Sequence, residues 1–178
     1  MTYARILVTG SRDFTSAPLV DQALEAAAII VTSPDPLLVH GAARGLDNLS
    51  RARAEAHGWV TEGHPAQWNT HEGCRCKDHT RRCGFAGFRR NNEMIALGAD
   101  LVLAFPMHMQ NDRTGSRGTW HCAESAADRD LAVLIIWNGR LFPLGDAGQT
   151  VLANRAARVG CPTGSRGDLA MSDAVVPF

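Results

Sequence analysis

Three short stretches of this 178-residue chain combine small residues, an arginine and an oxygen-bearing side chain. They are TGSRDF, which contains Arg12, HGAARGLD, which contains Arg44, and GSRGTW, which contains Arg117. An arginine binds phosphate through two parallel hydrogen bonds, and small residues let backbone N–H groups approach the same oxygen atoms. Each stretch is therefore a candidate contact for an anion.

The elements that must position these stretches alternate along the chain. Apolar runs typical of buried parallel strands end mostly at glycine or proline and cover residues 4–10, 36–41, 58–66, 99–106 and 131–137. Apolar residues at helical spacing predict helices over about 19–30, 46–56, 88–97 and 119–129. This alternation favours an α/β fold, a three-layer sandwich around a mainly parallel five-stranded sheet.

The carboxyl ends of parallel strands share one edge of such a sheet, and the following helices direct their positive amino termini toward it. The commonest strand order, 3-2-1-4-5, places the first and fourth strands on either side of a ligand-binding crevice. We therefore expect the three arginine-bearing stretches to converge there around a nucleotide-sized ligand. Each stretch alone also has a structural explanation, because Asp47 and Thr119 can cap helices and Arg12 can pair with Asp13 at the surface.

Composition argues against several classes of protein. Lysine plus arginine equals aspartate plus glutamate at 18 each, so no overall positive field draws the chain to a nucleic acid or an anionic membrane. No apolar run approaches the roughly 18 residues of a membrane span, and no charged-then-apolar leader is present. None of the three stretches has the spacing of the triple-glycine dinucleotide motif or the lysine-containing phosphate loop. We expect a cytoplasmic protein without a membrane partner.

Residues 71–84, HEGCRCKDHTRRCG, gather cysteine and histidine in one short segment. The pattern C-x-C-x2-H-x3-C predicts a structural zinc site with four ligands, Cys74, Cys76, His79 and Cys83. His71 and Asp78 are reserve candidates for a ligand. Two alternatives stay open, a flexible basic loop with free thiols and a Cys74–Cys83 disulfide in an extracellular protein. The basic residues of the segment can close over an anionic ligand or face the solvent.

The chain beyond Trp137 gives fewer signals. Residues 138–145 can turn and add an edge strand, and residues 149–160 carry one helical stripe. We expect residues 1–145 to form one domain, with 71–84 inserted into it. Residues 146–178 are then a C-terminal tail or an oligomerisation arm, and we expect a homo-oligomer.

Several of these motifs, taken in order, resemble the SLOG superfamily, which unites the DNA-processing protein DprA with LOG-type nucleotide phosphoribohydrolases. The motifs are VTGSRDF, VHGAARGLDNLSRARAEAHGW, PAQW, AGFRRNNEM, GADLVLAFP and RGTWHCAESA. The resemblance covers about residues 4–137 and is closest to the YspA-like branch, whose members are frequent in bacteria and phages. It implies a Rossmann-like fold and a pocket for a nucleotide or a nucleotide-derived small molecule.

The motifs and the resemblance together give one set of predicted ligand contacts. They are Gly10, Ser11, Arg12, Asp13, Gly41, Ala42, Arg44, Gly45, Asp47, Arg89, Arg90, Asn91, Pro106, Arg117, Gly118 and Thr119. Trp68 and Trp120 are further candidates to cover a base, with packing in the protein interior as the alternative role.

Whether the chain is also an enzyme depends on two positions. The resemblance implies a catalytic arginine from the helix before the fourth strand, which Arg90 matches, with Arg89 as the neighbouring candidate. It also implies a glutamate after a GGxGT loop, but the loop here is GSRGT and the matching positions hold His121 and Cys122. Glycosidic cleavage needs a carboxylate or a base, so Glu93 or His121 would have to replace that glutamate.

The sequence supports two candidate functions, a ligand-binding protein and an enzyme. The sequence favours a protein that senses or sequesters a nucleotide-type ligand, because the pocket motifs are present and the expected glutamate is not. The alternative is a LOG-like phosphoribohydrolase or another hydrolase of a nucleotide's glycosidic or phosphate bond. Single-strand DNA binding fits the same fold, but the zero net charge weighs against it.

Overall fold

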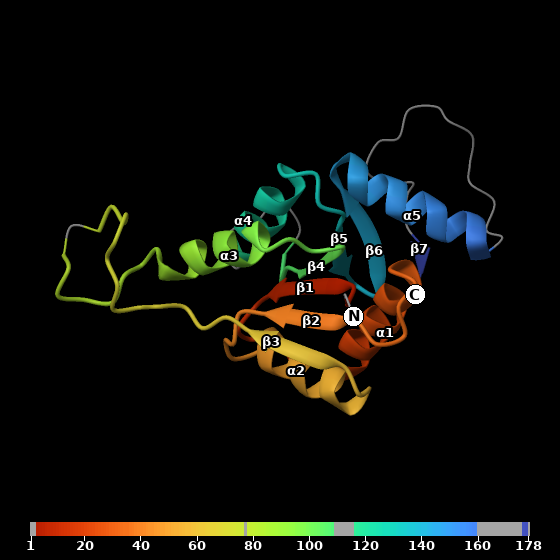
Figure 1. Ribbon diagram of the computed structural model, residues 1–178, viewed down its shortest axis with the longest axis horizontal. Helices are drawn as coiled ribbons and strands as arrows, with labels where there is room; N and C mark the ends of the chain where they lie inside the picture. Colours follow the sequence, from red (N-terminus) through yellow and green to blue (C-terminus); the bar gives the residue numbers. More distant parts are fainter. Residues whose placement is uncertain (1–2, 77, 109–115, 160–175, 178) are drawn as a thin grey trace.

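A mixed β-sheet runs through the protein in the computed structural model, which describes residues 3–76, 78–108, 116–159 and 176–177. Its strand order is β3-β2-β1-β4-β5-β6-β7 (Figure 1). The strands are β1 (Arg5–Gly10), β2 (Leu37–His40), β3 (Val60–Gly63), β4 (Leu101–Phe105), β5 (Val133–Trp137), β6 (Arg140–Leu144) and β7 (Val176–Pro177). The first five are parallel, which confirms the predicted mainly parallel sheet, and they follow the common order 3-2-1-4-5.

Two antiparallel strands extend the sheet beyond the five that the apolar runs predict. β6 pairs with β5 through a tight turn at Asn138 and Gly139, both of which have positive φ. β7 pairs in turn with β6. The sequence of β6, RLFPL, is a weak strand signal because a proline interrupts a short apolar run.

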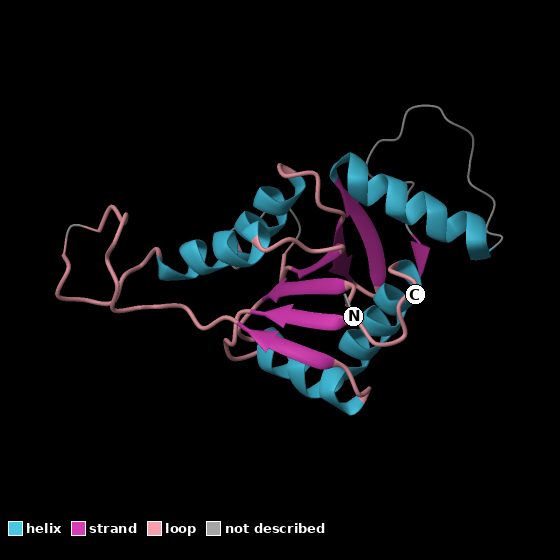
Figure 2. Cartoon of the chain, viewed as in Figure 1, coloured by secondary structure: helices cyan, strands magenta, loops and turns pink. Residues whose placement is uncertain are grey.

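Helices cover both faces of the sheet (Figure 2). They are α1 (Ala17–Ile30), α2 (Leu46–Ala56), α3 (Ala86–Ala96), α4 (Arg117–Ala127) and α5 (Gly145–Val159). Because side chains alternate along a strand, Ile6 and Val8 of β1 pack in a core with α1, α2 and α5, whereas Leu7 packs in a second core with α3 and α4. The three-layer α/β arrangement and the four predicted helices are confirmed.

The neighbouring strands β1 and β4 send the chain to opposite faces of the sheet. After β1 the chain crosses to α1 on one face, and after β4 it crosses to α4 on the other. Gly10 and Phe105 are paired in register at the carboxyl ends of these two strands. The loops that follow diverge from this point, which is where the strand order predicts a crevice.

The chain between β3 and α3 projects away from the sheet as a long excursion (Figure 1). It contains the predicted insertion, residues 71–84. Among its described residues, which are 64–76 and 78–85, only Cys83 is buried. These described residues therefore form no apolar core of their own.

The predicted C-terminal tail contains most of α5. Leu152 is buried in the core that α5 shares with α1 and α2. Gly148 lies so close to the sheet that an added Cβ would stand 2.4 Å from the Val133 carbonyl oxygen. Residues 160–175 and 178 lie outside the described part of the chain. Within the described part, no helix has both the length and the apolar character that a membrane span requires.

Arg5 and Glu62 connect β1 to β3 across the intervening strand, and this pair gives the protein a pH dependence. The guanidinium donates two hydrogen bonds of 3.0 Å to the Glu62 carboxylate, and His64 contacts the same group at 2.6 Å. The hydrogen bonds from Arg5 outweigh burial and lower the pKa of Glu62 to about 2 from 4.5. Because the folded-state pKa is depressed, the stability that this charge contributes is present above pH 4.5 and is lost as the pH falls toward 2.

We expect Glu62→Gln to lower the free energy of unfolding at pH 7 by up to about 1 kcal/mol, because both partners are partly exposed. The gap between the variant and the wild type should narrow as the pH approaches about 3, below the unfolded-state pKa. Urea unfolding of both proteins across this pH range measures the gap. A gap that is constant with pH would mean that the charge of Glu62 contributes nothing.

Candidate functional site

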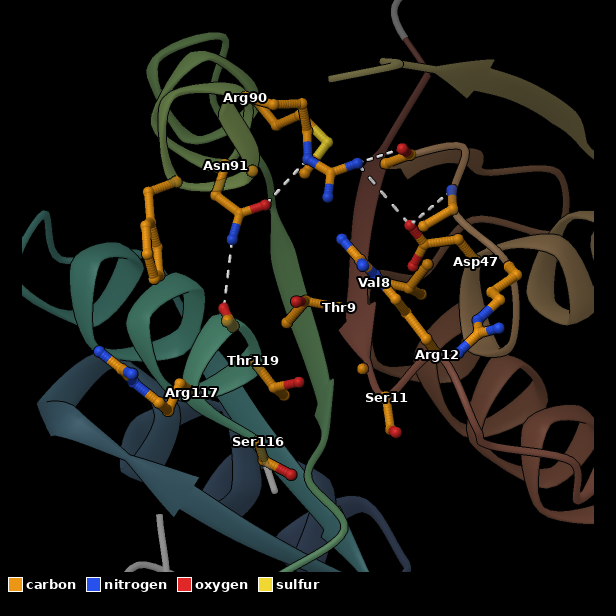
Figure 3. A pocket seen from close by; sticks show the side chains of 18 of the residues that line it. Val8, Thr9, Ser11, Arg12, Asp47, Arg90, Asn91, Ser116, Arg117 and Thr119 are labelled. Carbon is orange, nitrogen blue, oxygen red and sulfur yellow. Dashed lines mark hydrogen bonds and ion pairs between the residues drawn. The ribbon is translucent and has the colours of Figure 1, made fainter. Parts of the chain in front are cut away.

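A cavity of about 350 Å³ lies at the carboxyl end of β1, and the loops after β1 and β2 and the helices α3 and α4 surround it. Figure 3 shows side chains that reach it from the loop after β1 and from α2, α3 and α4. Its volume falls in the range of small-molecule sites. All three arginine-bearing stretches contribute to its wall, through Arg12, Arg44 and Arg117.

Most of the predicted ligand contacts line this cavity. Those that do are Gly10, Ser11, Arg12, Asp13, Gly41, Arg44, Asp47, Arg90, Asn91, Arg117, Gly118 and Thr119. The predicted contacts Ala42, Gly45, Arg89 and Pro106 are not in the wall. The wall also holds Trp68, a candidate to cover a base. The remaining residues of the wall lie outside the predicted set of contacts, although most of them stand in the quoted motifs: Val8, Thr9, Ala43, Gly84, Gly87, Phe88, Met94 and Ser116.

Two glycines let the loops come close enough to form the wall. At Gly41 an added Cβ would lie within 1.5 Å of the Arg90 guanidinium, so only glycine leaves room for that side chain. Gly45 has a φ of 75°, and a Cβ there would stand 2.3 Å from the backbone of Arg12. Gly45 therefore shapes the site without lining it, because it lets the loop before α2 pack on the loop after β1.

Three helices begin at the cavity, and none of them has a side-chain cap. The N-cap residues of α2, α3 and α4 are Gly45, Phe85 and Ser116, and no side-chain hydrogen bond caps any of them. The Ser116 hydroxyl instead accepts a hydrogen bond of 2.7 Å from the Met107 N–H. In α2, however, the N–H groups of Leu46 and Asn48 already donate to the carbonyl oxygens of Ser11 and Ala43, and in α3 the Ala86 N–H donates to that of Cys83. Among the described residues, the first N–H groups of α4 have no such partner and remain available to an anion, and the helix dipoles add partial positive charge.

A buried ion pair supports the floor of the cavity (Figure 3). Arg90 and Asp47 are 12% and 8% exposed, and the closest atoms of their charged groups are 3.8 Å apart. Arg90 also donates hydrogen bonds to the carbonyl oxygens of Gly41 and His64, while Asp47 accepts one of 3.2 Å from the Ala43 N–H. Burial raises the pKa of the Asp47 carboxyl, against the opposing effect of the Arg90 charge and the backbone N–H groups.

Asn91 links this pair to the helix on the opposite wall. Its side-chain oxygen accepts a hydrogen bond of 2.9 Å from Arg90, and its amide group donates one of 3.2 Å to the carbonyl oxygen of Gly118. Asn91 is itself 4% exposed. The start of α4 and the loop after β2 are therefore held at a fixed distance from each other.

The charges in the wall favour an anion. Four arginines face two carboxylates, and Arg90 is already paired with Asp47. Asp13 lies 3.3 Å from the Arg44 guanidinium, so it does not pair with Arg12 as the surface alternative proposed. The guanidinium of Arg12 instead lies over the ring of Trp68, 5.2 Å from its centre. Arg12 is therefore placed to contact a ligand in the cavity.

The candidate catalytic residues are not brought together. Arg90 lines the cavity, but Glu93 is exposed and outside its wall. His121 packs behind Phe88, with 4.5 Å between the ring centres, and its buried Nδ1 has no hydrogen-bond partner among the described residues. Burial also lowers the pKa of His121. Within the described residues, the only carboxylates in the wall are those of Asp13 and Asp47.

Three cysteines and a histidine of the insertion form a compact cluster. The ligand atoms of His71, Cys74, Cys76 and Cys83 all lie within 4.8 Å of one another. The spacing pattern predicts His79 as the fourth member with His71 in reserve, and the structure brings His71 rather than His79 into the cluster. The Nδ1 atom of His71 is 3.5 Å from the Cys74 sulfur, whereas His79 stacks on the His71 ring and contacts the Cys76 carbonyl oxygen.

The donor set of this cluster can hold a metal such as zinc. The sulfur atoms of Cys76 and Cys83 are 3.7 Å apart, close to the edge of about 3.8 Å in a tetrahedron with Zn–S bonds of about 2.3 Å. All cysteines in the described part of the chain are free thiols, including Cys74 and Cys83. The structure therefore does not contain the Cys74–Cys83 disulfide that stood as an alternative to the metal site.

The strand order defines a Rossmann-like α/β protein, and the cavity at the carboxyl end of β1 is its candidate site. A family model described as "YspA, cpYpsA-related SLOG family" matches residues 4–71. The chain is also 35% identical over 136 residues to the gene 61 protein of Mycobacterium phage D29, an alignment that covers 73% of this chain and 94% of that protein. No solved structure matches. The chain belongs to the YspA, cpYpsA-related SLOG family.

Proposed function

We propose that this protein binds a nucleotide or a nucleotide-derived small molecule at the carboxyl edge of its sheet, and that it acts as a sensor or a sequestering protein. One observation carries the proposal: three uncapped helix N-termini and four arginines meet at one cavity. The helix dipoles direct partial positive charge at the cavity, the start of α4 adds N–H groups, and the arginines offer charged donors to phosphate oxygens.

The arginines have different proposed roles, depending on whether each side chain is held in place or exposed. Arg90 is buried and tied to backbone oxygens, so it sets the shape and potential of the floor. Arg12 and Arg117 are exposed side chains at the rim, where they can close on a phosphate. The Ser11 hydroxyl accepts a hydrogen bond of 3.1 Å from the Asp13 N–H, which leaves its own proton free to donate to the ligand.

One observation favours a hydrolase as the second candidate. Asp47 is buried and lines the cavity, and burial raises the pKa of its carboxyl. A carboxyl of that kind can hold or release a proton during bond cleavage. It is nevertheless engaged by Arg90 and the Ala43 N–H, which is the arrangement of a structural group.

The two candidates are separated by incubating the protein with a panel of nucleotides and analysing the mixtures by chromatography. The panel contains the four common nucleoside monophosphates, a cyclic nucleotide and ADP-ribose, and calorimetry measures binding in parallel. We expect binding without release of base or phosphate. Release by the wild type but not by Asp47→Asn would establish the hydrolase, and absence of binding to every member would contradict both.

We also propose that the cluster of His71, Cys74, Cys76 and Cys83 holds a structural zinc ion in a reducing, cytosolic compartment. Four protein ligands would fill a tetrahedral shell and leave no position for a reacting water. The ion would take the place of an apolar core in the insertion. Whether the chain forms a homo-oligomer is a separate proposal, which light scattering tests.

Zinc content should distinguish the two histidines. We expect purified wild type and His79→Ala to retain about one zinc ion per chain, whereas His71→Ala loses most of it because one ligand is missing. Elemental analysis of the three proteins measures this, with melting temperature as a second readout. Equal zinc in all three would remove His71 from the site, and loss in His79→Ala alone would restore the ligand set that the spacing pattern predicts.

A further inference from the structure

Trp68, just before the insertion, forms part of the cavity wall, and Gly84 at the end of the insertion lines it as well. Trp68 is half-buried and lines the cavity, and two guanidinium groups lie over its ring at 5.2 Å and 4.8 Å. One belongs to Arg12 and the other to Arg82 of the insertion. Arg12 is part of the arginine cradle, by which we mean the four arginines and three helix N-termini at the cavity. A ring face that holds planar cations in this way also stacks a planar nucleobase.

Trp68 is held in place by the metal cluster rather than by a hydrophobic core. The Cys83 N–H donates a hydrogen bond of 2.7 Å to the carbonyl oxygen of Trp68, and Cys83 is the buried member of the cluster. Arg89 donates to the Cys83 sulfur at 3.3 Å and to the Thr70 carbonyl oxygen at 2.5 Å. The segment on both sides of Trp68 is thus fixed by contacts that converge on one proposed metal ligand.

Helix α3 connects the insertion to the arginine cradle. Arg89 and Arg90 are adjacent in α3, and Arg89 reaches the insertion while Arg90 reaches the floor of the cavity. Gly87, near the start of α3, lies beside the Trp68 ring, since a Cβ added there would be 3.9 Å from the ring, an ordinary van der Waals distance. The position of the ring relative to the arginines therefore depends on both the helix and the cluster.

We propose that the metal-bound insertion presents Trp68 as a stacking platform for the base of the ligand. This inference rests on the proposed function and deepens it: the arginine cradle binds the phosphate, and the insertion selects ligands that carry an aromatic base. When a base occupies the ring face, Arg12 exchanges its contact with the ring for one with the phosphate. Without metal, Cys83 no longer anchors Trp68 and the platform is lost.

The test compares ligands with and without a base. Affinities for AMP, GMP, CMP and UMP and for ribose 5-phosphate are measured by calorimetry on zinc-loaded wild type, Trp68→Ala, and reduced wild type stripped of zinc. We expect at least one nucleotide to bind the loaded wild type about 10-fold more tightly than ribose 5-phosphate. This preference should vanish in Trp68→Ala and in the stripped protein, while the affinity for ribose 5-phosphate changes little.

Each other outcome has a defined meaning. A preference that survives in Trp68→Ala or after zinc removal overturns the inference. Equal affinity for nucleotides and ribose 5-phosphate in the loaded wild type also overturns it but leaves the anion cradle standing, and no binding of any probe overturns the proposed function as well. Hydrogen exchange adds a readout that needs no ligand, since residues 66–70 should exchange faster in the stripped protein, and unchanged exchange would contradict the anchoring role of Cys83.

Discussion

Replacing Arg12 with alanine is expected to weaken nucleotide binding by about 10- to 100-fold and to leave the melting temperature near that of the wild type. The side chain is exposed, and within the described residues its contact is the face of Trp68. The fold therefore loses little when it is removed. A charged hydrogen bond to phosphate contributes about 1.5–3 kcal/mol, which corresponds to this change in affinity.

Two matched arginine variants serve as controls for Arg12→Ala. Arg44→Ala should weaken binding less, because the Arg44 guanidinium is already 3.3 Å from the Asp13 carboxylate. Arg140→Ala removes an exposed arginine from β6, outside the cavity wall, and should change nothing. Calorimetric titration of the three variants with the same nucleotide ranks their affinities. If Arg12→Ala and Arg140→Ala bound the nucleotide with equal affinity, Arg12 would not be a ligand contact.

Replacing Arg90 with alanine is expected to lower the free energy of unfolding by about 3 kcal/mol, well beyond the effect expected for the partly exposed pair of Arg5 and Glu62. The substitution leaves the Asp47 carboxylate buried without its cation and frees the carbonyl oxygens of Gly41 and His64. For a chain of this size the melting temperature should fall by roughly 6–12 °C. Ligand affinity should fall too, because the floor of the cavity changes.

A double variant separates the lost ion pair from the lost packing. Asp47→Asn removes the buried charge, so Asp47→Asn combined with Arg90→Ala should be more stable than Arg90→Ala alone. Differential scanning calorimetry of the two single variants and the double variant measures the coupling between the residues. Strict additivity, or an Arg90→Ala protein as stable as the wild type, would show that the pair contributes nothing to the fold.

The parallel core of the fold was predictable because its signals are periodic. Apolar runs ending at glycine or proline located β1 to β5, and the alternation with helical stripes indicated their parallel arrangement. β6 was not predicted with the same strength, since its short apolar run contains Pro143. β7 is a two-residue strand that pairs far along the chain, and pairing over such a distance leaves no local pattern.

The arginine cradle was predictable in outline, but the direction of individual side chains was not. Neighbouring residues on a helix point about 100° apart, so sequence alone does not decide whether Arg89 or Arg90 faces the cavity. Arg90 faces it, and Arg89 holds the insertion. For a related reason the spacing pattern put His79 first and His71 in reserve, whereas the structure places His71 beside the cysteines: an irregular loop has no period from which to infer which ring meets them.

Native mass spectrometry in the presence of a nucleotide panel tests the central claim most directly, because it detects the ligand and the metal on the same chain. The claim is that the helix termini and arginines at the edge of the sheet bind a nucleotide phosphate. We predict a complex of one nucleotide with the zinc-loaded wild type that is strongly depleted in Arg12→Ala but retained in Arg140→Ala. Identical adducts on all three proteins, or no adduct with any nucleotide, would contradict the claim.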